Sequence, residues 1–424
     1  MPELLEDFTE DQVARSRRRK RAVLPLRLAS AGVGFAAVCL LGFTRLGADL
    51  AHGAGSLAGG GWIATALLGA VALDLVLTLA GLPIVARSEV VNRRWGLSNR
   101  SWRLFWADEA KGFLIGAVML GGVSLGLFAL IRTLPGTWWI PAALAAVALV
   151  FVLSFLVPVV FEPLFNRFRP LPDGPLRDRL LSVAAQTSVT VRDILVSDAS
   201  RRTNSMNAYV SGMGRTRRVV VWDTTIEQAG PDQIAAICAH ELGHAARRDV
   251  VTGTAISAAG MVAGTLLLAA ALRWRGLLDA AGTPSATDPR SLALVVAIGT
   301  VLGMLGAPWF NAYSRHVEAR ADQYALDLTR DPSAVVATWR NLAVRGISDL
   351  EPHPLAQAWF GTHPAIPARI AHARRWAARH GVPVDLPRPA APDPVSKPAA
   401  PRPAPKPNAP QPAQPDSLGG TDGQ

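Results

Sequence analysis

The sequence predicts an all-α polytopic membrane protein that also carries a mixed domain, a small β-sheet with helices, inserted between and after its transmembrane helices. Half of the 424 residues are apolar and 18% are charged, against about 25% charged residues in ordinary soluble domains. Apolar stretches of about 18 residues or more, long enough to cross a bilayer, recur along the chain. The net charge is nevertheless +11, because arginines cluster where these stretches end. This combination excludes a uniformly disordered chain and an ordinary soluble protein.

Six apolar segments are long enough to span a bilayer as helices. They are residues 24–46, 62–86, 112–132, 138–161, 251–272 and 292–310. Arg-rich loops at 87–111 and 166–250 alternate with loops at 47–61 and 133–137 that lack Lys and Arg, although the loop at 273–291 carries three Arg. The positive-inside rule then places both termini and both Arg-rich loops in the cytoplasm. The Arg-heavy composition favours a bacterial plasma membrane.

The excess of basic residues indicates a lipid bilayer as partner and not a nucleic acid. The arginines gather at 15–21, 87–103 and 167–179, at the ends of apolar segments. Nucleic-acid binding would favour a basic stripe in a polar region, interleaved with aromatic residues, and the sequence has none.

The polar segments contain the mixed domain. Residues 175–186 favour a helix, 193–196 and 217–223 favour strands, and a helix opens at Gly230-Pro231-Asp232. Thirteen of the 43 residues from 382 onward are Pro, which predicts a disordered tail. The predicted division is a basic cytoplasmic N-terminus at 1–22, four transmembrane helices at 23–165, a cytoplasmic catalytic region at 166–250, two transmembrane helices at 251–310, completion of the catalytic region at 311–381, and the tail at 382–424.

The pentad His240-Glu241-Leu242-Gly243-His244 has the HExxH pattern on a predicted helix. Residues four apart lie on one helix face, so His240 and His244 can hold one Zn²⁺ between them. Glu241 can then reach a metal-bound water as general base. The alternative is a pair of surface histidines on an amphipathic helix. The pattern therefore predicts a zincin-like catalytic domain with one zinc ion per chain.

A catalytic zinc takes three protein ligands and keeps a fourth position open for water. The third ligand must come from outside the pentad, because Ala-Ala-Arg-Arg-Asp follows His244. We select Glu318, within SRHVEARAD, with His316 as the local rival. Asp322 lies one helical turn beyond Glu318, a spacing that suits an acceptor for the free N–H of a ligating histidine.

These motifs resemble the M48 family of integral-membrane zinc metallopeptidases, in its CaaX prenyl protease (Ste24-like) branch. The resemblance covers roughly residues 87–375. Besides HELGH and SRHVEARAD it is carried by four stretches, RRWGLSNRSWRLFWADEAKG, FEPLFNRFRPLPDGPLRDRL, SDASRRTNSMNAYVSGMGRTRRVVVWDTTI and GTHPAIPARI. The shorter HtpX branch shares the pentad and the ExxxD arrangement and ranks second. Eukaryotic members are described with seven spans, whereas six are counted here, and the family's aromatic-Gln pair is replaced by Ala319-Arg320.

The resemblance implies a role for each site residue. His240, His244 and Glu318 would be the zinc ligands and Glu241 the base. The segment Asn207-Ala208-Tyr209 would lie on an edge strand that binds the substrate backbone by strand addition. His363 would stabilise the oxyanion, with Arg369 nearby. Without the resemblance, Asn207 reads as a turn residue and His363 as a histidine of a surface loop.

The resulting hypothesis is a membrane-embedded zinc endopeptidase that cleaves peptides or membrane-associated proteins at the cytoplasmic face, in the manner of CaaX proteases. An HtpX-like quality-control protease of membrane proteins is one alternative. A non-enzymatic scaffold stabilised by zinc is another, although Glu241 would have no use there. A transporter would explain Asp74 within the second apolar segment, but the six segments show no internal repeat.

Overall fold

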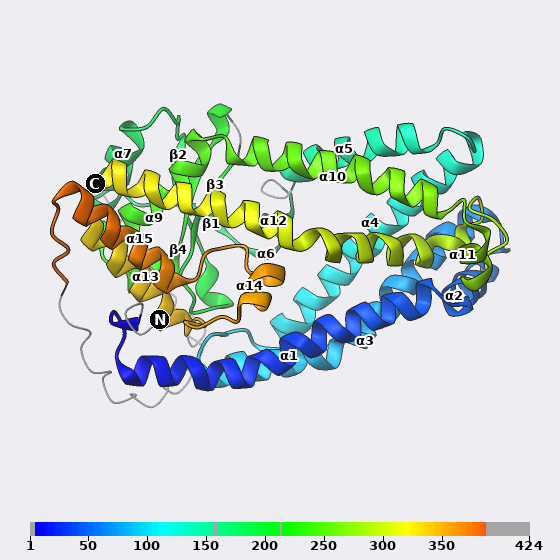
Figure 1. Cartoon of the computed structure of the whole chain (residues 1–424), viewed down its shortest axis with the longest axis horizontal. Helices are drawn as coiled ribbons and strands as arrows, with labels where there is room; N and C mark the ends of the chain where they lie inside the picture. The colour runs from blue at the N-terminus through cyan, green and yellow to red at the C-terminus, as the bar shows by residue number, and fades with distance from the viewer. Residues whose placement is uncertain (1–4, 157–159, 213, 387–424) are drawn as a thin grey trace, which may run out of the picture.

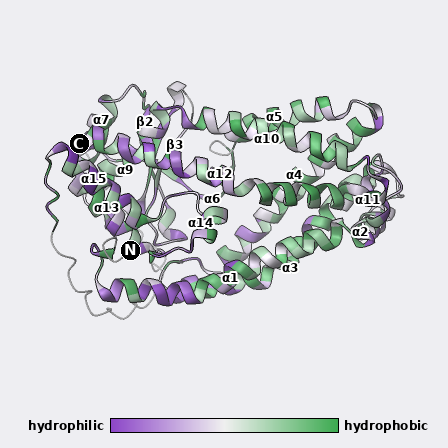
Figure 2. Cartoon of the chain, viewed as in Figure 1, coloured by the Kyte–Doolittle hydropathy of each residue, from purple (hydrophilic) through white to green (hydrophobic). Residues whose placement is uncertain are grey.

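The computed structural model describes residues 5–156, 160–212 and 214–386. Long helices form one end of an elongated molecule, and the sheet with its surrounding helices forms the other (Figure 1). Hydrophobic residues dominate the helical end, and hydrophilic residues gather at the end that contains the sheet (Figure 2). The predicted combination of a polytopic helical part and a small mixed domain is confirmed.

Five helices are long and apolar enough to cross a membrane in the described part of the chain. These are α1 (Glu10–Gly42), α3 (Trp62–Arg94), α4 (Trp102–Thr133), α10 (Asp249–Ala271) and the segment that contains α12 (Leu292–Thr329). They account for five of the six predicted segments. The predicted segment 138–161 contains the shorter apolar helix α5 (Trp139–Leu156), which packs against α10, and its residues 157–159 lie outside the described part. Its 18 residues rise about 27 Å, close to the thickness of the hydrocarbon core.

The N-terminal basic stretch and the first span form one continuous helix, whereas the sequence analysis separated them at residue 22. The helix α1 begins after Thr9, whose side chain and that of Gln12 form a reciprocal capping box. Arg and Lys are good helix formers, so the run at 16–21 does not interrupt the helix. The helix α12 is continuous in the same way, from its apolar part through Glu318 to Thr329.

The two predicted loops at the far end of the helices are partly helical. Residues 47–61 contain most of α2 (Arg45–Ser56), which packs against α3, and residues 273–291 contain α11 (Arg275–Ala280) and a 3₁₀ turn at Pro289–Ser291. Close approach of α2 and α3 depends on glycine, since a Cβ at Gly69 would lie 3.0 Å from that of Ala51. Elsewhere in the bundle, the carboxylate of Asp74 lies against Gly116 of α4, and its Oδ2 has no hydrogen-bond partner among the described residues.

The sheet has four strands in the order β1-β2-β4-β3. The predicted strands are β2 (Asp193–Ser197) and β4 (Arg218–Trp222), which pair in parallel. The antiparallel strand β1 (Phe168–Pro170) was not predicted, because three residues give too little alternation to recognise. The antiparallel strand β3 (Ala208–Ser211) contains part of the edge strand that the family resemblance implied at 207–209. Since β3 is the last strand in the order, it forms an edge of the sheet.

Helices cover the sheet and complete the mixed domain. The apolar core beneath β2 and β4 includes residues of α7 (Pro175–Ala185) and α9 (Pro231–Ala246), such as Leu180 and Leu242. The remaining helices are α6 (Glu162–Phe165), α8 (Asp223–Gln228), α13 (Pro332–Gly346), α14 (Pro354–Phe360) and α15 (Ile366–His380).

The start of the predicted tail belongs to the folded domain. Val382, Val384 and Leu386 pack against the core formed by α13 and α15, and the backbone N–H of Asp385 donates to Ser333 Oγ. The first residues of the predicted tail therefore contact the folded domain. Residues 387–424 of the predicted tail lie outside the described part of the chain.

The end of α1 packs closely against α12 at Gly42. A Cβ there would overlap Ala293 and Ala297, whereas a Cβ at Gly34 on the same helix would meet nothing within 4 Å. We predict that Gly42→Val destabilises the protein by about 1–3 kcal/mol through overpacking, and that Gly34→Val does not. Melting temperatures of the purified variants in one detergent measure the difference. Equal melting temperatures would contradict the tight α1–α12 contact.

Candidate active site

The helix α9 presents the two histidines of the pentad on one face. Pro231 stands in its first turn, where its missing N–H costs no hydrogen bond. Leu242 and Cys238 point into the core beneath the sheet, which fixes the rotation of the helix. The Nε2 atoms of His240 and His244 lie 3.3 Å apart. The predicted i, i+4 pair is therefore present.

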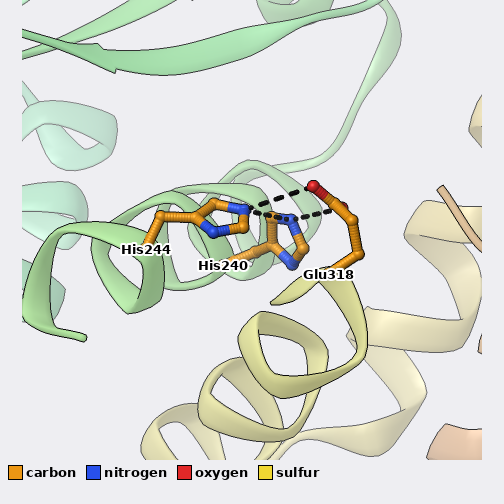
Figure 3. A group of neighbouring side chains, drawn as sticks. All are labelled: His240, His244 and Glu318. Carbon is orange, nitrogen blue, oxygen red and sulfur yellow. Dashed lines mark hydrogen bonds and ion pairs between the residues drawn. The ribbon is translucent and has the colours of Figure 1, made fainter. Parts of the chain in front are cut away.

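The helix α12 packs against α9 and adds a carboxylate to the pair. Gly243 allows the two helices to pack closely, because a Cβ at this position would lie only 3.0 Å from the ring of Tyr324. Glu318 Oε2 is 3.4 Å from His240 Nε2, and Glu318 Oε1 is 3.5 Å from His244 Nε2 (Figure 3). One ligand atom from each of the three residues lies within 4.8 Å of the others. The rival His316 is exposed and is not part of this group.

The three side chains fit a metal ion. Glu318 Oε2 is buried and accepts no well-formed hydrogen bond among the described residues, and its long contacts are with His240 Nε2 at 3.4 Å and Arg369 Nη2 at 3.5 Å. A buried carboxylate oxygen with such long contacts has room for a further partner such as a metal ion. Two imidazoles and one carboxylate form the donor set of several catalytic metal sites and leave a fourth position for a water or substrate.

Acidic side chains contact the Nδ1 atoms of both histidines, on the side of each ring away from Glu318. His240 Nδ1 is 3.0 Å from Asp322 Oδ1, and His244 Nδ1 is 3.0 Å from Asp249 Oδ2. Arg369 donates two hydrogen bonds to Asp322, at 2.7 and 2.6 Å. Such contacts fix the ring orientation and the tautomer of a ligating histidine.

Asp249 is a site residue that the sequence analysis missed. It is the first residue of α10 and is brought back toward His244 because Arg248 adopts a left-handed conformation, with φ of 57°. A non-glycine residue in that conformation is uncommon, and nothing in the local sequence predicts it. Arg320 Nη2 donates to Asp249 Oδ1 at 2.6 Å, so the residue that departs from the family pattern supports the partner of a candidate ligand.

Burial and neighbouring charges shift the pKa values of the group. Burial lowers the pKa of His240, but hydrogen bonds to Asp322 and Glu318 outweigh it and raise the pKa to about 9. Burial raises the pKa of Glu241, and the nearby histidines oppose this shift. Partial removal of the ring from water lowers the pKa of His363, although its side chain stays 58% exposed, and the attraction of Glu318 opposes this shift.

A loop after α14 brings His363 to the group. Its Nε2 lies 3.3 Å from Glu318 Oε1, and its side chain is 58% exposed. Arg315 Nη1 of α12 holds this loop by donating to the carbonyls of Gln357 and Gly361, at 2.9 and 2.7 Å. His363 therefore lies at the open side of the metal-binding group.

The segment 207–209 lies at the start of the edge strand β3. Asn207 directly precedes the strand, and its carbonyl accepts from the backbone N–H of Trp222 at 3.0 Å. Ala208 is buried, whereas Tyr209 is half-buried and donates from its hydroxyl to Glu162 Oε2 at 3.0 Å. The strand packs against α9. The predicted edge position is present, and the substrate-binding role of these residues stays a prediction.

The fold and this group of side chains together define a membrane-embedded metallopeptidase. Residues 170–377 match the profile of peptidase family M48, and residues 1–167 match that of the CAAX prenyl protease N-terminal region, with five membrane helices. The chain belongs to peptidase family M48, as the resemblance in its motifs implied.

Relatives and a solved structure agree with this membership. The chain is 32% identical over 308 residues to the "Uncharacterized metalloprotease YhfN" of Bacillus subtilis, covering 72% of each. It is 27% identical over 318 residues to CAAX prenyl protease 1 of Saccharomyces cerevisiae, covering 70% of this chain and 69% of the relative. The crystal structure of S. mikatae Ste24p has the same fold, with a TM-score of 0.79, 22% identity, and coverage of 87% of this chain and 90% of that chain.

Replacing Asp249 tests whether its contact with His244 Nδ1 strengthens metal binding. We predict that Asp249→Asn lowers metal affinity by about 10–100-fold, because the amide supports the histidine ring less well than the carboxylate does. Metal content after equilibration against graded chelator concentrations measures the change. Asp279→Asn, at an exposed position of α11, is the matched control. An unchanged affinity in Asp249→Asn would refute a role for this contact.

Proposed function

We propose that this protein is a zinc-dependent endopeptidase that cleaves membrane-associated peptides or proteins at the cytoplasmic face. The observation that carries the proposal is the convergence of His240, His244 and Glu318 beside Glu241. Membership of family M48 supports peptide hydrolysis as the reaction.

The donor set favours zinc as the metal. Zinc accepts two imidazoles and a carboxylate and keeps an open tetrahedral position in catalytic sites. When bound there, it would polarise the scissile carbonyl and make the attacking water more acidic. A structural zinc site would instead have four protein ligands, which argues against the scaffold alternative.

Glu241 is suited to act as the general base. It follows the first histidine on α9, so its side chain lies beside the metal-binding group. Because burial raises the pKa of its carboxyl, the group comes closer to neutral pH, where it can take a proton from water and later donate it to the leaving amine.

His363 is suited to stabilise the oxyanion of the tetrahedral intermediate. Partial removal from water lowers the pKa of its imidazole, which favours the neutral form. Its Nδ1 lies 2.8 Å from the hydroxyl of Thr362. When Nδ1 accepts from that hydroxyl, Nε2 carries the proton and can donate a hydrogen bond to the developing negative charge.

The side of the membrane and the class of substrate follow from charge and family. The Arg-rich segments 15–21, 87–103 and 167–179 favour the cytoplasm for the end of the molecule that carries the group, and for both termini. Relatives named CAAX prenyl protease 1 support substrates cut near the C-terminus of membrane-associated proteins. The edge strand β3 would hold the substrate backbone by strand addition.

The base is tested by Glu241→Gln. We predict that the variant keeps about one zinc per chain and loses about 10²–10⁴-fold in cleavage of a quenched fluorescent peptide, because the ligands remain while proton transfer is lost. Metal analysis and initial rates give the two quantities. Glu227→Gln, at an exposed position of α8, should match the wild type in both. Full activity in Glu241→Gln would exclude the proposed mechanism.

The raised pKa of His240 predicts how zinc binding depends on pH. With a pKa of about 9, His240 is mostly protonated at neutral pH in the metal-free protein, and zinc must displace this proton. Zinc affinity should therefore rise with pH, by up to about tenfold per unit below the pKa, and level off above it. Competition with a chelator of known pH dependence, between about pH 7 and pH 10, measures the slope. An affinity that does not change over this range would contradict the raised pKa.

A further inference from the structure

A cavity of about 510 Å³ opens beside the candidate active site. His363 and Arg369 line it on the side of the metal-binding group, and Ser205 and Met206, just before β3, line it next to the edge strand. The basic half of α1 forms another wall, with Arg19, Lys20 and Arg27. The cavity therefore joins the candidate active site, the start of the edge strand and a group of cations from the N-terminal helix.

The cations of α1 are not balanced by acidic groups of the cavity. Asp349 is the one carboxylate among the described lining residues, and it pairs with Lys20 at 2.9 Å. Arg19 donates to the carbonyl of Ile347 at 3.1 Å, while its buried Nε has no hydrogen-bond partner among the described residues. Arg27 is exposed and forms no ion pair within the described part of the chain. Two positive charges thus remain available to an anion.

The geometry of β3 indicates which end of a bound peptide would reach the cavity. The bond from Trp222 N–H to the Asn207 carbonyl marks a hydrogen-bonded pair of the β3–β4 ladder. Bonded and non-bonded pairs alternate, so the N–H and C=O of Ala208 and Val210 point away from β4, toward the open edge. A peptide added there in antiparallel orientation would run with its C-terminal end past the start of β3, where Ser205 and Met206 line the cavity.

We propose that this cavity binds a carboxylate on the C-terminal side of the scissile bond, through Arg19 and Arg27. The proposal rests on the proposed peptidase function and adds a determinant of specificity to it. A parallel peptide would bring its N-terminal ammonium to the cavity, and the cations would repel it, so the charge of the cavity favours the antiparallel orientation. The carboxylate is the C-terminal group of a short substrate tail or an acidic side chain in the same position.

Binding to Glu241→Gln tests the proposal without requiring cleavage. The protein is placed in nanodiscs of neutral phosphatidylcholine, and three fluorescent peptides that differ only at the C-terminal residue or its terminal group are compared. The first ends in a free carboxylate, the second in an amide, and the third in an amide with Asp at the last position. We expect the free acid to bind about tenfold more tightly than the plain amide, as for a charged hydrogen bond. The third peptide distinguishes a terminal from a side-chain carboxylate, and tight binding of either acidic peptide supports the proposal.

Variants on α1 assign the effect to the cavity. Arg27→Gln and Arg19→Gln, each combined with Glu241→Gln, should reduce the ratio of acid to amide affinity toward one. Arg21→Gln is the matched control, because Arg21 is exposed on the same helix and does not line the cavity. An unchanged ratio in both Arg27→Gln and Arg19→Gln would overturn the assignment to these residues.

Two further outcomes would overturn the proposal. Equal binding of all three peptides would exclude carboxylate recognition, even if the active protein cleaves each of them, and the proposed function would then stand alone. If anionic phosphatidylglycerol abolishes the preference for the acidic peptides in proportion to its content, the cations bind lipid headgroups. If the wild-type protein shows no zinc-dependent cleavage of any peptide, the proposed function fails. The binding measurement on Glu241→Gln does not require cleavage, so the two failures can be told apart.

Discussion

The packing of α12 across α9 is the contact on which the rest of the candidate site depends. Glycine at 243 lets the ring of Tyr324 approach, and this closeness places Glu318 over the two histidines. Asp322, one turn farther along α12, then reaches Nδ1 of His240. Side chains one turn apart share a helix face. The contact between α12 and α9 therefore supplies both the third candidate ligand, Glu318, and the carboxylate that contacts the first candidate ligand, His240.

Local periodicity explains what could be predicted from the sequence. The i, i+4 spacing of His240 and His244 and the i, i+4 spacing of Glu318 and Asp322 are properties of one helix each, and the structure brings the four residues together. The polytopic fold and the family membership are confirmed. The roles of the site residues and the division into domains stay predictions.

Features that depend on distant parts of the chain could not be predicted. Asp249 reaches His244 only through the left-handed turn at Arg248, and the three-residue strand β1 exists because it pairs with β2. The polar half of α1 reads as a separate basic tail, yet it is tied to the mixed domain. Ser16 Oγ donates to the carbonyl of Ser348 at 2.6 Å, and Arg17 Nε lies 2.7 Å from Glu351 Oε2. These contacts join residues more than 300 positions apart.

The continuity of α12 links the bilayer to the chemistry. One helix runs from the apolar bundle into the mixed domain (Figure 1). Pro308 lies near the end of its apolar part, ten residues before Glu318. A helix advances about 1.5 Å per residue and resists stretching, so its depth and tilt in the lipid fix the height of that carboxylate above the membrane surface. The apolar part of α12 and the carboxylate of Glu318 therefore belong to one continuous helix. In this protein, a single helix carries both a candidate membrane span and a candidate metal ligand.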